Sequence, residues 1–478
     1  MSAPRASAAK AAAGLLLLSL ACFACDGGGR RPNLILVSVD TLRADHLGTY
    51  GYERETSPFL DALADSGVVF ERAFAQVPGT LPSHMSMFTG LYPAQHDVYP
   101  PNDVLSTDIE TLPEILESHG YRTGGFTEGG YVSGFYGFAR GFDSFDDTVT
   151  RGNRLLERTI GEGLDFLDRV GDDEPFFLFL HTYAVHDPYQ PPEEYRPLFW
   201  EGAVPDTFEP TGPNFVAVNR GRRTVTAEEV RYFESLYDAG IRYVDDQLQR
   251  LWQRLQRDGL SERTLLVVTS DHGEEFLEHG HLVHEQNYVE TTHVPLIVVG
   301  PGLPAGTRVG TLVQSIDLAP SLLDLAGLAD TAEEMTGRSW KRLLTAPDGA
   351  LRDFAYSESF VHPVRGIVRL DRERGELLSL LESRIPAEPD GQWIGRTARL
   401  DTLAETLELE AVSFRIPRPL RVEDGEAALS TTGLQPDVWT PVTLELGPGA
   451  PPAPPVGARP ARSRRSSASE PDRRAVFV

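Results

Sequence analysis

Cysteine is scarce in this sequence of 478 residues, which has only two, Cys22 and Cys25. Two cysteines cannot form the disulfide framework that holds small secreted domains together. Basic residues are also the minority, with 44 Lys and Arg against 70 Asp and Glu and a formal net charge of −26. This balance argues against a nucleic-acid partner, because proteins hold phosphate backbones mainly with lysine and arginine. With 41% hydrophobic residues, the chain is long and apolar enough to bury a large core.

The N-terminal residues have the pattern of a secretory leader. Arg5 and Lys10 precede an apolar run at 11–21, which is shorter than the roughly 20 residues that a membrane span needs. The residues before Cys22 resemble a bacterial lipobox, in which the cysteine receives a lipid, although the shifted leucine leaves ordinary signal cleavage as an alternative. We therefore expect 1–29 to be a leader and tether. The protein is then exported and attached to a bacterial envelope membrane, in the periplasm or at the outer surface, through its N-terminal lipid alone.

Strand-like and helix-like segments alternate from residue 30 onward. Short apolar runs, typical of strands buried on both faces of a parallel sheet, occur at 33–39, 176–180, 264–269 and 294–299. Helical patterns occur at 57–65, 112–118, 153–170 and 227–258. This alternation predicts an α/β fold with a large, mostly parallel sheet covered by helices.

The organisation of the chain changes after about residue 350. We expect a catalytic domain over 30–350 and a small β-rich subdomain over 351–446, in which 411–416 and 439–446 favour strands. Residues 447–478 are rich in Pro, Ala, Arg and Ser, which is typical of a disordered tail.

Polar residues with useful chemistry stand at the ends of three of the apolar runs. Asp40 follows the first, His181 the second, and Asp271 with His272 the third. Open α/β sheets bind ligands outside the carboxyl ends of their strands, so we expect these residues to form one site. Asp and His are also the metal ligands available in a chain body without cysteine.

A helix start supplies a further candidate. Pro82 fits the first turn of a helix and Gly90 fits its end, which places Thr80 at the N-terminus. The free amides and the dipole of a helix N-terminus favour a negatively charged oxygen. Seven of the 12 histidines also lie between 181 and 293, so they are concentrated near the candidate site in the sequence.

Several motifs resemble those of one protein family. They are NLILVSVD (33–40), TLPSH (80–84), FTGLYP (88–93), TSDHGE (269–274), VPLI (294–297), DLAPSLL (317–323) and TGRS (336–339). Their order is that of the sulfatase family, a branch of the alkaline-phosphatase superfamily, and the resemblance covers about residues 32–345. It implies a large mixed, mostly parallel sheet sandwiched by helices, one divalent cation and a nucleophile at a helix start.

The departures from this family concern the nucleophile. Members of the sulfatase family share a Cys or Ser that is converted to formylglycine. In this sequence Thr80 occupies the matching position, and His84 occupies the position of the usual Arg. Oxidation of Thr gives a ketone and not the required aldehyde. Asp40-Thr41 replaces the paired aspartates of many members, and no Gly-Lys-x-His element is found near 127–130. The remaining residues are Asp40, Thr80, Asp271 and His272. This set is similar to that of superfamily members with a threonine nucleophile, such as lipoteichoic acid synthase and phosphoethanolamine transferases.

The resemblance implies a role for each site residue. The metal ligands are Asp40, Thr80, Asp271 and His272, and the catalytic residues are Thr80, His84, His186 and His284. The cation is Ca, Mn, Mg or Zn, since carboxylates suit the hard ions and a histidine admits Mn or Zn.

Each residue also has a structural alternative. Thr80 fits a helix N-cap, Asp40 a turn residue, and the Asp271 and His272 pair a helix cap. His84 either orients Thr80 or only covers the helix. The remaining residues considered are Glu128, a weaker site candidate, and His181, His279, His281 and His293, for which a structural role is at least as good.

These observations predict a metal-dependent hydrolase of sulfate or phosphate esters whose substrate is a small-molecule, glycan or lipid ester. A phosphotransferase that passes the group from Thr80 to a glycan or lipid is one alternative. The other is a catalytically inactive surface binding protein. The retained Asp40, Asp271 and His272 argue against the inactive protein, because a dead site has no chemical need for metal ligands.

Overall fold

The structure is a computed structural model. It describes residues 30–149, 154–205, 209–284, 286–352 and 354–358, and beyond these the backbone of six strands between 364 and 415. The leader with its two cysteines, the strand expected at 439–446 and the tail at 447–478 lie outside the described residues.

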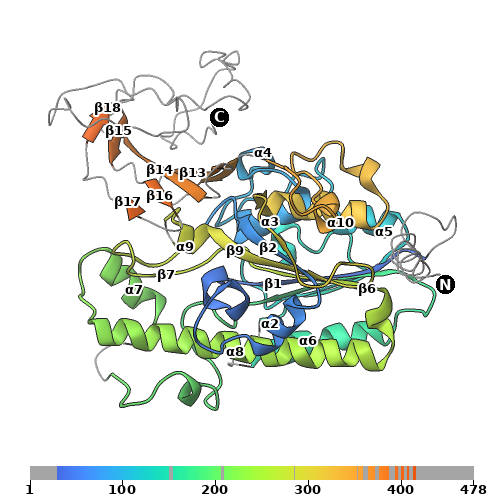
Figure 1. Cartoon of the computed structure of the whole chain (residues 1–478), viewed down its shortest axis with the longest axis horizontal. Helices are drawn as coiled ribbons and strands as arrows, with labels where there is room; N and C mark the ends of the chain where they lie inside the picture. Colours follow the sequence, from blue (N-terminus) through green and yellow to red (C-terminus); the bar gives the residue numbers. More distant parts are fainter. Residues whose placement is uncertain are drawn as a thin grey trace, which may run out of the picture.

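A nine-stranded sheet forms the centre of the molecule (Figure 1). Its order is β10 (Thr307–Val309), β2 (Val68–Phe74), β9 (His293–Val299), β6 (Thr264–Thr269), β1 (Asn33–Val39), β5 (Phe176–Thr182), β3 (Arg122–Phe126) and β4 (Ser144–Asp146), with β11 (Val313–Gln314) beside β2. Strands β6, β1, β5, β3 and β4 are parallel neighbours, whereas β9 runs antiparallel to both β6 and β2. The predicted mixed, mostly parallel α/β sheet is confirmed.

The direction of β9 corrects one detail of the prediction. The apolar run at 294–299 has the composition of the parallel strands, but it is antiparallel to its neighbours. A strand that is buried on both faces has the same continuous apolar pattern whichever way it runs.

Helices cover both faces of the sheet. Figure 1 shows α8 (Ala227–Arg257), α2 (Pro58–Ala64) and α6 (Leu155–Leu167) below the sheet, and α3 (Thr80–Thr89), α5 (Leu112–Ser118) and α10 (Leu318–Leu325) above it. Shorter elements are α4 (Pro93–His96), α7 (Gly212–Asn219), β7 (Glu275–Phe276), β8 (Leu282–Val283) and α9 (Val289–Thr292). The four helices predicted from the sequence are α2, α5, α6 and α8, with bounds shifted by three residues at most.

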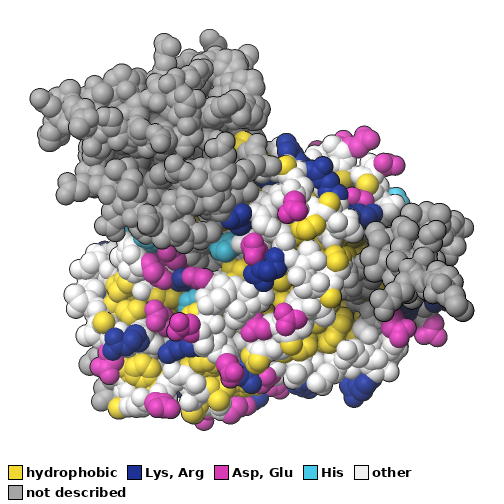
Figure 2. All heavy atoms as spheres, viewed as in Figure 1, with side chains coloured by type: hydrophobic (Ala, Val, Ile, Leu, Met, Phe, Trp, Pro, Cys, Tyr) yellow, Lys and Arg dark blue, Asp and Glu magenta, His cyan; other side chains and the backbone are white. Residues whose placement is uncertain are grey.

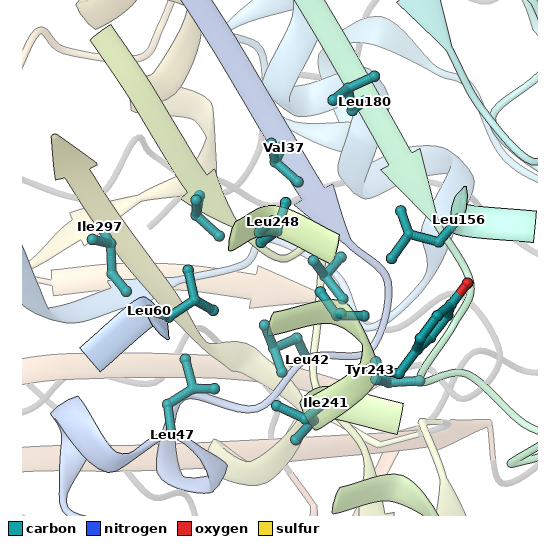
Figure 3. Close-up of a cluster of buried hydrophobic side chains, with 14 of the residues drawn as sticks. Val37, Leu42, Leu47, Leu60, Leu156, Leu180, Ile241, Tyr243, Leu248 and Ile297 are labelled. Carbon is teal, nitrogen blue, oxygen red and sulfur yellow. The ribbon is translucent and has the colours of Figure 1, made fainter. Parts of the chain in front are cut away.

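Alternate residues of β1 pack into two different apolar clusters. Val37 and Val39 belong to the cluster that includes residues of α2, α6 and α8, and Leu36 belongs to the cluster that includes residues of α3, α5 and α10. Figure 3 shows Val37 and Leu180 of the sheet with Leu248 of α8 in the first cluster. Complete burial of one such side chain contributes about 1.5–3 kcal/mol. This two-sided burial fixes β1 between β5 and β6, so their carboxyl ends lie together.

A second, antiparallel sheet follows the first. It comprises β12 (Phe354–Glu358), β13 (Val364–Asp371), β14 (Glu376–Pro386), β15 (Trp393–Arg396) and β18 (Ser413–Arg415). In addition, β16 (Leu400–Thr402) pairs with β14, and β17 (Thr406–Leu407) pairs with β16. The N–H of Glu358 donates to the carbonyl of Gln76 at 2.8 Å, which fastens β12 to the segment that leads into α3. In the part of the chain that the structure describes, none of the helices combines the length and the apolar character of a membrane span.

A buried carboxylate of α8 fixes the start of α2. Asp245 is fully buried and accepts the N–H groups of Phe59 and Leu60, each at 2.8 Å. The first N–H groups of a helix have no partner within the helix, so a carboxylate from another element satisfies them.

We predict that Asp245→Ala lowers the free energy of unfolding by about 1–3 kcal/mol, because it leaves two buried N–H groups unpaired. Chemical denaturation followed by circular dichroism measures the loss. Asp165→Ala, an exposed position on α6, is the matched control and is expected to have little effect. Equal stability of the two variants would contradict this role of Asp245.

Candidate active site

Residues from three parallel strands converge at the carboxyl edge of the sheet. Asp40 directly follows β1, Asp271 and His272 follow β6, and His181 is the last residue but one of β5. The Oδ2 of Asp40 lies 3.3 Å from the Nε2 of His181, and the Oδ2 of Asp271 lies 3.3 Å from the Nε2 of His272. The predicted convergence of these strand ends is therefore present.

Asp40, Asp271 and His272 each have one side-chain atom without a hydrogen-bond partner among the described residues. These atoms are the Oδ1 of Asp40, the Oδ2 of Asp271 and the Nε2 of His272, on side chains that are completely buried. These three residues offer ligand atoms that all lie within 4.8 Å of one another. Buried polar atoms without partners are costly, and carboxylate oxygens with an imidazole nitrogen are common ligands of divalent cations. The three residues thus fit a divalent cation.

The protonation of the cluster follows from burial. Burial and the adjacent charge of Asp271 raise the pKa of Asp40 to about 7. Burial also opposes ionisation of Asp271, but His272 and His84 outweigh it and hold its pKa below the usual range. Burial lowers the pKa of His181 to about 3 and lowers the pKa values of His84 and His272 as well. Neutral imidazoles result, and these have the free lone pair that metal coordination requires.

Helix α3 begins at Thr80 beside this cluster. Its N-cap residue is Gly79, and the Thr80 side chain makes no capping hydrogen bond. Gly90 ends the helix in the left-handed conformation, with φ of 65°, as the sequence predicted. The hydroxyl of Ser83 donates to the carbonyl of Asp271 at 2.7 Å and so holds the first turn against the end of β6. The N-cap alternative for Thr80 is therefore wrong.

His84 ties the start of α3 to β1. Its Nδ1 donates to the carbonyl of Thr80 at 2.9 Å, and its Nε2 lies 2.9 Å from the hydroxyl of Ser38. The same Nδ1 is 3.4 Å from the Oδ2 of Asp271. Both ring nitrogens are thus engaged, and the geometry favours the alternative in which His84 orients the Thr80 turn.

His186 and His284 lie at the more open end of the site. Their side chains are 22% and 20% exposed, and their ring centroids are 5.1 Å apart. The ring of His284 also lies 4.4 Å from that of His272, and its Nδ1 is 2.9 Å from the Oε1 of Glu274. Figure 2 shows histidine side chains at the surface in the region of β7 and α9. We call the opening beside His186 and His284 the mouth of the site.

His186 favours a positive charge at the mouth of the site. Burial disfavours the charged form of His186, but the carboxylates of Asp40, Asp187 and Glu274 outweigh it and raise its pKa to about 9. These carboxylates thus favour the protonated form of the His186 imidazole. It can attract an anionic ester or give a proton to a leaving oxygen.

Lysine plays no part in the described site. The sequence has only two lysines, Lys10 and Lys341, and Lys341 pairs with Asp324. The buried guanidinium of Arg43 is held by Asp45 at 2.7 Å and by Glu278. Within the described residues of the site, the cationic group at the mouth is thus the imidazole of His186 in its protonated form.

The remaining candidates divide between the site and the surrounding structure. His181, for which a structural role was at least as good an expectation, lies beside Asp40. His279 instead pairs with Glu290 at 2.9 Å, and His293 donates to the carbonyl of Glu71. Glu128 accepts the hydroxyl of Thr182 at 2.6 Å and the N–H of Tyr183 at 2.9 Å, which places it in the wall of the site.

The sequence analysis did not predict that Glu274 and Tyr183 belong to the site. Glu274 holds His284, and Tyr183 lies with its ring edge-on to both His181 and His186, at centroid distances of 4.6 and 5.5 Å. Glu274 belongs to the TSDHGE motif, which was the available signal. Tyr183 had no comparable signal, because an aromatic residue after a strand is common.

Comparison with known proteins identifies the type of protein. The model of the family described as "Sulfatase" matches residues 32–328. Arylsulfatase K of Mus musculus is 24% identical over 341 residues, which cover 62% of this chain and 61% of the relative. An arylsulfatase of Clostridium perfringens is 24% identical over 392 residues, which cover 69% of this chain and 81% of the relative. The chain thus spans about three fifths of the length of the first of these relatives.

Solved structures share the fold. A protein solved in complex with its substrate D-glucosamine-2-N,6-O-disulfate has a TM-score of 0.64 and 18% identity, with 78% of this chain and 92% of that chain covered. The phosphonate monoester hydrolase of Agrobacterium radiobacter has a TM-score of 0.59 and 22% identity, with coverages of 78% and 90%. The fold is thus of the sulfatase and alkaline-phosphatase type. The chain belongs to the sulfatase family.

We predict that the purified protein retains about one equivalent of a divalent cation after dialysis and that Asp271→Ala loses it, because this variant removes one of the three unpartnered ligand groups. Elemental analysis of the dialysed protein measures the metal content. Asp330→Ala, an exposed position, is the control and keeps the ion. Full retention of metal by Asp271→Ala would contradict the assignment of the cluster.

Proposed function

We propose that the protein is a metal-dependent hydrolase of sulfate or phosphate esters with Thr80 as its nucleophile. The observation that carries this proposal is the set of three unpartnered ligand atoms on Asp40, Asp271 and His272 beside the first turn of α3. These three residues hold the cation and Thr80 joins them as a ligand. The ion is Ca, Mn, Mg or Zn. When bound, such a cation lowers the pKa of a hydroxyl and neutralises ester oxygens.

The residues of the chain supply the other parts of the reaction. The Oγ1 of Thr80 loses its proton to solvent and forms a bond to the phosphorus or sulfur of the ester, while the bond to the leaving oxygen breaks. His284 or the protonated His186 gives a proton to that oxygen. Water then cleaves the Thr80 ester and restores the hydroxyl. The N-terminal amides of α3 favour the negative oxygens of the transferred group.

A threonine nucleophile favours esters of phosphorus over esters of sulfur as substrates. An aldehyde hydrate can release its sulfate by elimination, whereas a sulfated Thr80 can be freed only by attack on sulfur. A Thr80 phosphoester has a direct hydrolytic route. The likeness in fold to a phosphonate monoester hydrolase supports this preference, while the arylsulfatase relatives keep sulfate esters within the proposal.

The substrate and the location are part of the same proposal. A glycan ester is supported by the structural neighbour that was solved with a sulfated glucosamine. We also propose that the protein is exported and held at a bacterial envelope membrane by a lipid on Cys22, since the leader pattern is present and one relative is an extracellular sulfatase homologue of Drosophila melanogaster. In this proposal the catalytic unit is 30–350, followed by the subdomain at 351–446 and the tail at 447–478.

We predict that the Mn²⁺-loaded enzyme hydrolyses bis(4-nitrophenyl) phosphate or 4-nitrophenyl phenylphosphonate with a higher kcat/KM than 4-nitrophenyl sulfate. Thr80→Ala is expected to lower kcat by at least about 10³-fold, because it removes the attacking oxygen. Release of 4-nitrophenol measures both rates. Thr89→Ala, at the other end of α3, is the matched control. Full activity of Thr80→Ala would contradict the assignment of Thr80 as the nucleophile. A higher kcat/KM for 4-nitrophenyl sulfate would contradict the preference for phosphorus esters.

A further inference from the structure

Exposed apolar side chains gather around one loop near the site. The large apolar side chains that are exposed in the described part of the chain are Val104, Tyr131, Phe135, Val149, Leu198 and Val204. Two of the six, Tyr131 and Phe135, lie within residues 129–137, which we call the 129–137 loop. Val149 lies next to Gly129, and Val104 precedes Leu105, whose N–H donates to the carbonyl of Tyr136. Phe135 is 62% exposed and Tyr131 is 42% exposed. A concentration of exposed apolar surface on a soluble protein marks a binding surface.

The 129–137 loop is held in one conformation. Gly129 and Gly130 both have positive φ, and a Cβ on Gly129 would lie 2.6 Å from the carbonyl oxygen of Asp147. The Oδ2 of Asp147 accepts the N–H of Gly134 at 2.8 Å. The rings of Tyr131 and Phe135 both pack on Tyr136, with centroid distances of 6.0 and 4.9 Å. The two exposed rings are thus presented on a fixed support, which lowers the entropy lost on binding.

The backbone of the 129–137 loop is joined to the mouth of the site through Tyr183. The N–H of Tyr131 donates to the hydroxyl of Tyr183 at 3.0 Å. The ring of Tyr183 in turn lies 5.5 Å from that of His186, which stands at the mouth. Groups next to an ester in the site are thus within reach of the 129–137 loop.

We propose that Tyr131 and Phe135 form a platform that binds a sugar ring next to the ester. This inference rests on the proposed function for the nature of the ester. Flat, rigid aromatic faces suit the C–H face of a pyranose, and the phenol of Tyr131 adds a polar group. The neighbouring surface includes the partly exposed carboxylates of Asp103 and Asp147 and the chain has a net charge of −26, which disfavours an anionic lipid surface.

The test is the binding of neutral oligosaccharides that carry no ester. Cellohexaose, chitohexaose and maltohexaose are titrated into the full-length protein and into the double variant Tyr131→Ser/Phe135→Ser, with isothermal titration calorimetry as the measurement. We expect at least one hexasaccharide to bind, and its affinity to fall at least tenfold in the double variant. Leu198→Ser, which removes an exposed apolar side chain at another position, is expected to bind as the unchanged protein does.

Several outcomes would overturn the platform. They are the absence of binding by all three sugars, equal binding by the double variant, and binding to phosphatidylglycerol vesicles that the double variant loses.

Thr80→Ala separates the platform from the proposed function, because it removes the nucleophile and leaves the rings in place. Sugar binding with a fully active Thr80→Ala would refute the function alone. An inactive Thr80→Ala with no sugar binding in any variant would refute the platform alone.

Discussion

Two buried carboxylates that lie close together are the constraint on which this structure depends. Asp40 and Asp271 are both completely buried, and each keeps an oxygen without a hydrogen-bond partner among the described residues. Uncompensated buried charges of one sign cost several kcal/mol each. The raised pKa of Asp40, which favours its uncharged form, and the proposed cation offset this cost. The cluster is therefore stable as a ligand-binding centre and would be poorly designed as a purely structural one.

The sheet and α3 bring the cluster together. The apolar residues of β1 are buried on both faces, which keeps β6 and β5 on either side and aligns the ends of the three strands. All ten residues of α3 are buried, so the helix cannot shift freely, and its first turn is tied to Asp271 through Ser83 and to Ser38 through His84. The same packing that stabilises the core thus sets the position of Thr80.

Much of the fold and part of the site could be predicted because local signals were strong. The bounds of β1 and β6 follow from continuous apolar runs, and Asp40, Asp271 and His272 follow those runs directly. The antiparallel direction of β9 could not be predicted, since an apolar pattern carries no information on direction. The contacts of Glu274 with His284 and of Tyr131 with Tyr183 also escaped prediction. They depend on how loops after different strands meet.

The most direct test of the Thr80 assignment is the mass of the chain during turnover. The Mn²⁺-loaded enzyme is mixed with excess bis(4-nitrophenyl) phosphate, quenched in acid within the first turnovers and digested for peptide mass spectrometry. We expect an aryl phosphoryl group on Thr80, in the peptide that includes the start of α3. Turnover without any adduct, or an adduct on another residue, would contradict the assignment of Thr80 as the nucleophile.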